Sequence, residues 1–462
     1  MRKVILFSAA LQPDVQAPSK DNSYGLGLGY LHAVIEKAGY EILTKNFNNS
    51  DLAASEAEMA ADLARFCPDF LLIQIFTMNR VASYRLIRMA REILPGVKII
   101  IGGVHASIFY DQLLKNFEVD CAVIGEGEAT VVELLDALSS GGSAAGIAGA
   151  AYREGGKVIK NPDRPLIEDL DSIPFPRHEL FIKPDREMAC ILTSRGCPYK
   201  CSFCCLHTIS RRKFRKRSVG NVADEIEYIL GTFKNIKSIQ LADDTFTLDQ
   251  PRAIAFCREI IKRNIKVKFL CSARIKPASV ELFELMARAG FTHIGFGLET
   301  GSARLLSSIH KNITKADVVR TFEMLKGIKI NAVTYLMVGF PGETNETVAE
   351  TISLVKTLQK IKYFEFVGVA RLWVYPNTEV YDIMKAGGRI DDAFWLTDRN
   401  VPFFTLEHSE EGLDMMVARI TLACTPWRQA GRRMFNHILH PVAAVKKNMG
   451  RLRRLKKMLF KR

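Results

Sequence analysis

Residues 193–204 read Thr193-Ser194-Arg195-Gly196-Cys197-Pro198-Tyr199-Lys200-Cys201-Ser202-Phe203-Cys204 and place three cysteines in a C-x3-C-x2-C pattern directly after a predicted strand. Three thiolates this close together can bind three irons of a four-iron, four-sulfur cluster and leave the fourth iron without a protein ligand. Such an open iron can take a small molecule. Zinc usually has four protein ligands, or three and a water, so a zinc knuckle or a chance group of buried cysteines is the weaker interpretation.

The residues around this run predict a parallel α/β domain. Strands are expected at residues 188–194, 238–241, 268–273, 293–298, 331–338 and 364–373, with helical patterns between them. Six strands over about 200 residues agree with the roughly 30 residues that one strand–helix unit needs. The pattern therefore predicts a six-stranded partial (β/α)6 TIM barrel with its site at the carboxyl ends of the strands.

The N-terminal third predicts a second α/β domain, a doubly wound parallel sheet. Short strands at residues 4–7, 41–43, 70–75, 98–101 and 121–124 alternate with helical patterns. Glycine-rich turns at residues 25–29, 102–105 and 125–128 fall where such sheets bind ligands. The first turn lacks the G-x-G-x-x-G spacing, so a nicotinamide site is not expected.

Four regions are expected along the chain. They are the sheet domain (residues 1–140), a linker with a hairpin around Gly155 (141–185), the barrel (186–385) and a C-terminal helical region with a basic tail (386–462). Thirteen Lys and Arg and no Asp or Glu occur from Met415 to Arg462, so the tail carries nearly all of the net charge of +14. Residues 440–462 have apolar residues at helical spacing, which predicts a basic amphipathic helix suited to an anionic membrane surface. A helix packed on the barrel and a disordered end are the alternatives.

Composition excludes several other classes of protein. The ten cysteines lack the spacing of a small disulfide framework, and no secretory signal opens the chain, so a reducing, cytoplasmic setting is expected. No apolar stretch is long enough to span a membrane. The basic run at residues 211–217 is interpreted as a solvated loop beside the cluster, and no nucleic-acid partner is expected. Cys205 is expected to be a small buried residue.

The cysteine triplet, with the aromatic Phe203 directly before its last cysteine, resembles the signature of the radical S-adenosylmethionine (radical SAM) family. The resemblance implies that Cys197, Cys201 and Cys204 bind a 4Fe–4S cluster and that S-adenosylmethionine (SAM) binds its open iron. It also implies that an electron from the cluster cleaves SAM to a 5'-deoxyadenosyl radical. Phe203 then lies against the adenine.

The strand ends supply the other expected SAM contacts. Asp243 or Asp244 stands where many members of the family have a Gly-Gly-Glu run for the SAM amino group. Arg274 can pair with the SAM carboxylate, because guanidinium binds carboxylate through two hydrogen bonds. Glu299 can bond the ribose hydroxyls. The alternative for each residue is an ordinary salt bridge within the barrel.

The glycine turns of the first domain, taken together, resemble the cobalamin-binding domain that precedes the radical SAM core in one large subfamily. The resemblance assigns Gly102, Gly103, Gly125, Glu126 and Gly127 to the cobalamin site. A domain that has kept the fold without the cofactor is the alternative.

The cobalt ligand departs from one known pattern. No D-x-H-x-x-G run occurs in the chain, so His105 is expected to be a loop residue near the corrin and not the axial ligand. We therefore expect base-off, His-off cobalamin, with its lower face near Phe76, Thr77 and Met78.

The resemblance implies an enzyme that uses a 4Fe–4S cluster, SAM and cobalamin, with electrons from a donor such as flavodoxin or ferredoxin. Two reaction classes dominate the subfamily: methylation of an unactivated carbon, and non-methylating chemistry such as oxidative cyclisation or rearrangement. We expect methylation, on an apolar, lipid-like substrate if the tail contacts a membrane. A non-catalytic cobalamin or iron–sulfur sensor is the alternative from another class.

Overall fold

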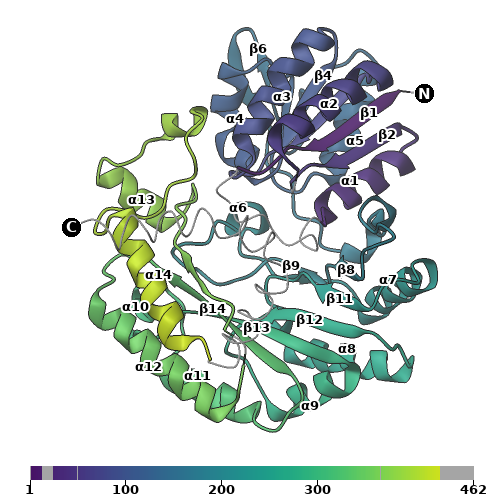
Figure 1. The fold of residues 1–462 in the computed structure, drawn as a ribbon. Helices are drawn as coiled ribbons and strands as arrows, with labels where there is room; N and C mark the ends of the chain where they lie inside the picture. Colours follow the sequence, from purple (N-terminus) through teal and green to yellow (C-terminus); the bar gives the residue numbers. More distant parts are fainter. Residues whose placement is uncertain (1, 13–23, 49, 365, 427–462) are drawn as a thin grey trace.

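The computed structural model describes residues 2–12, 24–48, 50–364 and 366–426. Its first domain, at the top of Figure 1, is built on a seven-stranded sheet. Five strands are parallel, in the order β2-β1-β3-β4-β5: β1 (Lys3–Ser8), β2 (Glu41–Asn46), β3 (Phe70–Gln74), β4 (Lys98–Gly102) and β5 (Cys121–Val123). This order places the switch point, where such sheets bind ligands, between β1 and β3. The predicted doubly wound domain is confirmed.

Helices cover both faces of this sheet because its central strands are apolar on both sides. On β1, Val4 and Leu6 pack towards α1 and α5, whereas Ile5 and Phe7 pack towards α2, α3 and α4. The helix bounds are α1 (Leu26–Lys37), α2 (Leu52–Phe66), α3 (Arg80–Ile93), α4 (Val104–Asn116) and α5 (Glu128–Ser139).

The hairpin that was expected in the linker belongs to the first sheet. Strands β6 (Ala150–Glu154) and β7 (Lys157–Lys160) form it, and β6 pairs antiparallel with β5. Ala150, Ala151 and Tyr152 of β6 are buried, on both faces of the sheet, so pairing with β5 buries apolar surface that a free linker would expose. The connector proper therefore begins after Lys160 and includes the short helices η2 (Leu170–Ser172) and η3 (His178–Leu180).

The second domain is the predicted partial barrel. Six parallel strands run in the order β15-β14-β13-β12-β11-β8: β8 (Met188–Ile191), β11 (Ser238–Leu241), β12 (Lys268–Ala273), β13 (Phe291–Glu299), β14 (Asn331–Val338) and β15 (Val369–Arg371). The last strand is shorter than expected, because Gly368 has φ +128° and interrupts the extended backbone before Val369. The first ends at Ile191, and the separate strand β9 (Ser194–Arg195) pairs with β10 (Arg215–Lys216).

Helices surround the barrel and begin at side-chain caps close to the strand ends. The residues Ser218, Asp249, Ser279, Thr314 and Thr344 each accept a hydrogen bond from a backbone N–H of the first turn of the helix that follows. These helices are α7 (Val219–Thr232), α8 (Gln250–Lys262), α9 (Val280–Ala289), α11 (Lys315–Met324) and α12 (Asn345–Ile361). Shorter elements are α6 (His207–Ser210), η4 (Phe246–Leu248) and α10 (Ala303–Ser308).

The C-terminal region ties the two domains together. It contains α13 (Glu379–Ala386), η5 (Asp392–Leu396) and α14 (Glu410–Cys424), and α14 packs on α12 and β15. Trp395 of η5 is fully buried in the core on the α2–α4 side of the first sheet. The Arg80 side chain, also fully buried, donates to the backbone oxygens of Trp395 and Thr397. The expected amphipathic helix at residues 440–462 lies outside the described residues, and no described helix is long and apolar enough to cross a membrane.

Candidate functional site

The three predicted ligands lie on one loop that starts and ends in a two-stranded stem. Strands β9 and β10 form the stem, and residues 196–214 between them, here named the cluster loop, carry Cys197, Cys201 and Cys204. All ten cysteines of the chain are free thiols, and the four in the loop, Cys205 included, are partly exposed. Gly196 has φ +88°, and a Cβ there would lie 2.1 Å from the carbonyl oxygen of Lys213, so only glycine fits where the loop leaves the stem.

The thiols of the cluster loop must lose their protons before they can bind iron. Burial raises the pKa of Cys204 to about 11, and the neighbouring Cys201 and Cys197 add to the rise. Iron binding must therefore displace a proton from this thiol. Among the described residues no three His, Cys, Asp or Glu surround a single metal-ion position. A cluster does not need such a group, because each thiolate binds a different iron.

Asp243 holds the residues that lead into the loop and is not free to bind SAM. Its two carboxylate oxygens accept four hydrogen bonds, from the backbone N–H and the hydroxyl of Thr193 and of Ser194, at 2.5–3.2 Å. The side chain is buried. Asp243 was one of two alternatives for the SAM amino group, and the structure corrects its role to that of a clamp.

Asp244 is therefore the remaining acidic candidate at the end of β11. One carboxylate oxygen accepts the N–H of Gly196 at 3.1 Å, next to the first cysteine. The side chain keeps solvent-accessible surface although protein atoms surround it. Burial raises the pKa of Asp244 to about 6, and the charge of Asp243 adds to the rise against the hydrogen bond from Gly196.

Arg274 lies directly beside the cluster loop. Its guanidinium is 3.6 Å from Cys201 Sγ and stacks on the ring of Tyr199, and another of its nitrogens donates to the Lys311 backbone oxygen. Its Nε is buried and has no partner among the described residues. A buried donor without a partner is costly, so it fits an anionic group bound at this position, such as the SAM carboxylate or a cluster sulfide.

Glu299 forms the salt bridge that was its alternative interpretation. Its carboxylate lies 2.7 Å from Lys311 Nζ, and both side chains are buried. Lys311 also lies 6.0 Å from the ring centre of Phe203, and the Phe203 ring packs on Phe340. Sequence reasoning missed Lys311 because it lies between α10 and α11, away from every strand end, and only its burial identifies it.

At the carboxyl edge of the first sheet the residues fit a bound corrin in two respects. Gly125 has φ +83° and open space beside it, since a Cβ there would meet only Arg211, at 4.0 Å. Gln12 Nε2, next to the switch point, is buried and has no partner among the described residues. Gly103 serves the fold, because its Cβ would lie 2.8 Å from the Ile75 oxygen. Gly102 and Gly127 make only ordinary contacts.

His105 lies in α4 and not in a loop. Its side chain is fully buried, with Nδ1 3.3 Å from the Thr77 hydroxyl and Nε2 2.9 Å from the Tyr84 hydroxyl. Its ring also packs near Trp395. With both nitrogens engaged, His105 is not placed to bind cobalt. The expectation of a loop residue near the corrin was wrong because Trp395, distant in sequence, covers it.

Glu126 points away from the corrin edge and into the domain interface. Its carboxylate accepts from Arg195 and Arg215, the facing residues of the stem, and from the backbone N–H of Ile167. Burial alone would raise the pKa of Glu126, but the hydrogen bonds from Arg215 and Ile167 and the charge of Arg195 lower it below its usual range. The run 211–217 was expected to be solvated, yet Arg215 and Arg217 are buried in ion pairs.

The buried His105 predicts a pH-dependent stability. Burial lowers the pKa of His105 to about 3, and the charge of Arg80 adds to this effect. The unfolded chain takes up this proton near pH 6.5, whereas the folded chain does not until about pH 3, so stability falls as the pH drops below 6.5. At pH 5 the expected loss is about 2 kcal/mol. Urea unfolding at pH 7 and pH 5 should show that His105→Asn removes about this much of the difference in the free energy of unfolding. An equal difference in the wild-type protein and in the variant would contradict the prediction.

Comparison with known proteins agrees with this geometry. Residues 191–355 match the Radical SAM superfamily, and residues 15–135 match the B12 binding domain. An uncharacterized methyltransferase of Pyrococcus horikoshii is 31% identical over 83% of this chain and 83% of its own length. The anaerobic magnesium-protoporphyrin IX monomethyl ester cyclase of Rubrivivax gelatinosus is 29% identical over 71% of this chain and 61% of its own length.

A solved structure has the same fold. The radical S-adenosylmethionine methyltransferase TsrM from Kitasatospora setae, with tryptophan and a SAM analogue bound, superimposes with a TM-score of 0.68. It is 20% identical, over 84% of this chain and 77% of its own. The two-domain architecture is therefore shared across a wide sequence distance.

Proposed function

The chain belongs to the radical SAM enzymes that carry a B12 binding domain, and from this premise we propose that it methylates an unactivated carbon of an apolar substrate. Its cofactors are a 4Fe–4S cluster, SAM and cobalamin. When bound, the cluster supplies the electron that cleaves SAM, and cobalamin supplies the methyl group. The observation that carries the proposal is the contact between the part of the first domain that would bind cobalamin and the loop that would bind the cluster. Helix α4, which follows β4 of the first sheet, packs on α6 of the cluster loop.

The chain's own residues have distinct roles in this proposal. Cys197, Cys201 and Cys204 hold the cluster, while Arg274 binds the SAM carboxylate through its unpartnered Nε. Asp244 accepts from the SAM amino group, because Asp243 is fully occupied by Thr193 and Ser194. Phe203 lies against the adenine, and the Glu299–Lys311 pair stands beside it as a contact for the ribose.

The inner wall of the barrel supports an apolar substrate. On β14, Leu336 and Val338 pack on the outer helices, so the alternate residues Val333, Tyr335 and Met337 face the barrel interior. The Tyr335 side chain is 47% exposed there. Its ring lies over Gly295 of β13, where a Cβ would come within 2.6 Å of it. Small residues on one strand and apolar ones on the next leave an open, mainly apolar wall.

A non-methylating reaction is the second candidate. The similarity to a protein of Rubrivivax gelatinosus favours it, because this relative, which aligns with 71% of the chain, is named a cyclase. A flavodoxin or ferredoxin as electron donor, and contact of the basic tail with an anionic membrane, belong to the proposal and rest on the sequence.

Metal counting and isotope transfer test the proposal together. The protein purified without oxygen and with cobalamin supplied should contain about four irons and one cobalt per chain. With methyl-labelled SAM, a reductant and a lipid extract of cells, we expect the label in a lipid-soluble product and 5'-deoxyadenosine alongside it. Formation of 5'-deoxyadenosine without transferred label would support the cyclase alternative. Four irons without cobalt would overturn methyl transfer from cobalamin, and full cofactor content without SAM cleavage would indicate a sensor.

A further inference from the structure

Four buried charges join the first domain to the stem of the cluster loop. Glu126 ends the turn after β5, Glu128 begins α5, and the stem contributes Arg195 and Arg215. The side chains are only 7%, 11%, 16% and 4% exposed, in that order. Two carboxylates and two guanidinium groups balance in charge, which a buried group of this kind requires.

Glu126, Arg195 and Arg215 are each held by more than one bond, and Glu128 is held by its ion pair with Arg195. Glu126 Oε1 lies 3.0 Å from Arg195 and 2.9 Å from Arg215, while Oε2 accepts from Arg215 at 2.7 Å and from the Ile167 N–H at 3.0 Å. Arg195 reaches Glu128 with its other nitrogen at 2.7 Å. Bonds of this charged, two-pronged type fix orientation as well as distance.

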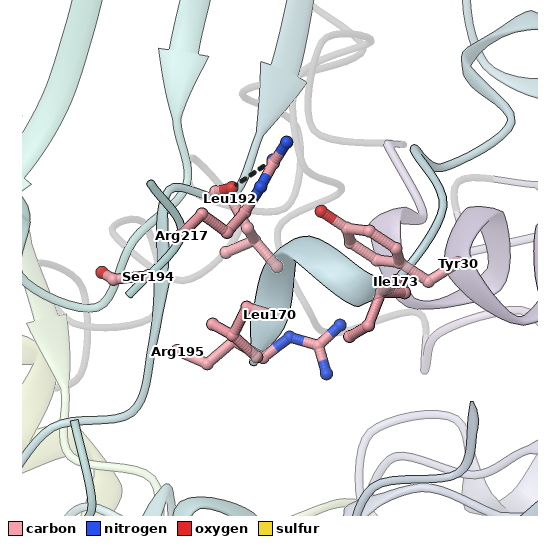
Figure 2. A pocket seen from close by; sticks show the side chains of 7 residues that line it. All are labelled: Tyr30, Leu170, Ile173, Leu192, Ser194, Arg195 and Arg217. Atoms are coloured by element: carbon pink, nitrogen blue, oxygen red, sulfur yellow. Dashed lines mark hydrogen bonds between the residues drawn. The ribbon is translucent and has the colours of Figure 1, made fainter. Parts of the chain in front are cut away.

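The surroundings keep water away from this group. Arg195 stacks on Tyr30 of α1, and the two side chains border a cavity of about 10 Å³ between the domains (Figure 2). That volume holds at most about one water. Its other lining residues come from the connector and the barrel: Leu170, Ile173, Leu192, Ser194 and Arg217. Charges in such an enclosed place interact more strongly than exposed ones.

The position of the group is what distinguishes it from other contacts between the domains. Arg195 directly precedes the glycine that starts the cluster loop, and Arg215 directly follows the loop. On the other side, Gly125 is fastened to α4 by its N–H, which donates to Ser107 Oγ at 3.0 Å. The turn at the corrin edge and the loop that carries the cysteines are thus held by one carboxylate.

We propose that Glu126, through Arg195 and Arg215, is a positioning residue that couples the cobalamin site to the cluster site. The inference rests on the proposed use of both cofactors in one reaction. Transfer between the two sites needs their separation fixed, because a displacement of about 1 Å can cost about 100-fold in rate. Because coupling is reciprocal, a filled cluster site should tighten cobalamin binding by the factor by which cobalamin tightens the cluster site.

Binding of hydroxocobalamin to the full chain, measured with and without the reconstituted cluster, tests this coupling. In the wild-type protein we expect the cluster to lower the Kd for hydroxocobalamin by about 5-fold or more. In Glu126→Gln the factor by which the cluster lowers this Kd should fall to near one. Arg195→Lys, which cannot bridge both carboxylates, is the second variant and should reduce the factor too. Glu36→Gln is the matched control, because Glu36 pairs with Arg177 of the connector and not with the stem, so it should keep the wild-type factor.

Each other result has a defined meaning. Cobalamin binding to the wild-type protein with a factor of one would overturn the coupling and leave the proposed function standing. No cobalamin binding by the wild-type protein would overturn both. If Glu126→Gln and Arg195→Lys both lose cobalamin binding while Glu36→Gln keeps it, Glu126 is part of the binding site itself and the positioning role is wrong. An unchanged factor in Glu126→Gln, with the variant folded, would also overturn the inference.

Discussion

Replacing Cys201 with alanine should abolish SAM cleavage. Cys201 lies in the middle of the ligand triplet and 3.6 Å from the Arg274 guanidinium, so its loss removes an iron ligand and leaves the buried Arg274 beside a gap. Changes to groups that only support a ligand already cost 10–100-fold in metal affinity, and loss of the ligand itself should exceed about 100-fold. Iron content and 5'-deoxyadenosine formation, measured on anaerobically reconstituted protein, should both fall to background.

Cys205→Ala is the matched control for this experiment. Cys205 is adjacent to Cys204 and lies outside the C-x3-C-x2-C spacing, so it was not assigned to the cluster. It was expected to be buried, and the structure shows it partly exposed. This variant should keep about four irons and the wild-type rate of SAM cleavage. Persistent cleavage in Cys201→Ala, or its loss in Cys205→Ala, would show that the ligand assignment is wrong.

The neighbours Asp243 and Asp244 should respond to the same substitution in opposite ways. Asp243→Asn puts amide hydrogens against the donors of Thr193 and Ser194 in a buried site, and the free energy of unfolding should fall by about 3 kcal/mol. The cluster should also be lost more readily, because these residues lead into the cluster loop. Urea unfolding of the cluster-free protein and iron retention on dilution measure the two effects.

Asp244→Asn should leave the cluster-free protein equally or more stable at neutral pH. The folded state raises the pKa of Asp244 to about 6, which means that its ionised form is disfavoured by the fold above that pH. An uncharged side chain removes this cost, while binding of the SAM ammonium group should weaken because the carboxylate is gone. A stable Asp243→Asn variant, or an Asp244→Asn variant with unchanged SAM affinity, would contradict the two roles.

The architecture could be predicted from the sequence because short patterns of apolar and polar residues determine the strands and helices of both domains. Alternating apolar runs and helical segments predicted both sheets, and the strands at Ser238–Leu241, Lys268–Ala273 and Asn331–Val338 have the expected bounds. The cysteine triplet predicted its own cluster because its ligands are neighbours in the chain. Local patterns therefore predicted the main features of the fold, and spacing together with the family resemblance supplied the assignment of the three cysteines, which stays a prediction.

The roles of the polar residues depended on partners distant in sequence. The acidic pair after β11 is evident in the sequence, but only the structure shows that Thr193 and Ser194 bind Asp243, whereas Asp244 accepts only from Gly196. His105 stood in a recognisable glycine turn, yet Trp395 buries it. Glu126 stood in another, yet two arginines of the stem turn it away from the corrin edge. In each case a tertiary contact decided the role, and no local pattern encodes that contact.

The burial of Trp395 and Arg80 has a consequence for the order in which the chain is made. Strands β1 to β4 and helices α1 to α4 of the sheet domain are synthesised by Asn116, but Trp395, which belongs to the core on their α2–α4 side, is synthesised much later. At a synthesis rate of about 5–20 residues per second, the apolar surface of helices α2–α4 stays exposed for tens of seconds before Trp395 is made. We therefore expect that the first domain is not a detachable module: made alone, it would expose the apolar surface around Tyr84 and Phe109 that Trp395 contacts in the full chain.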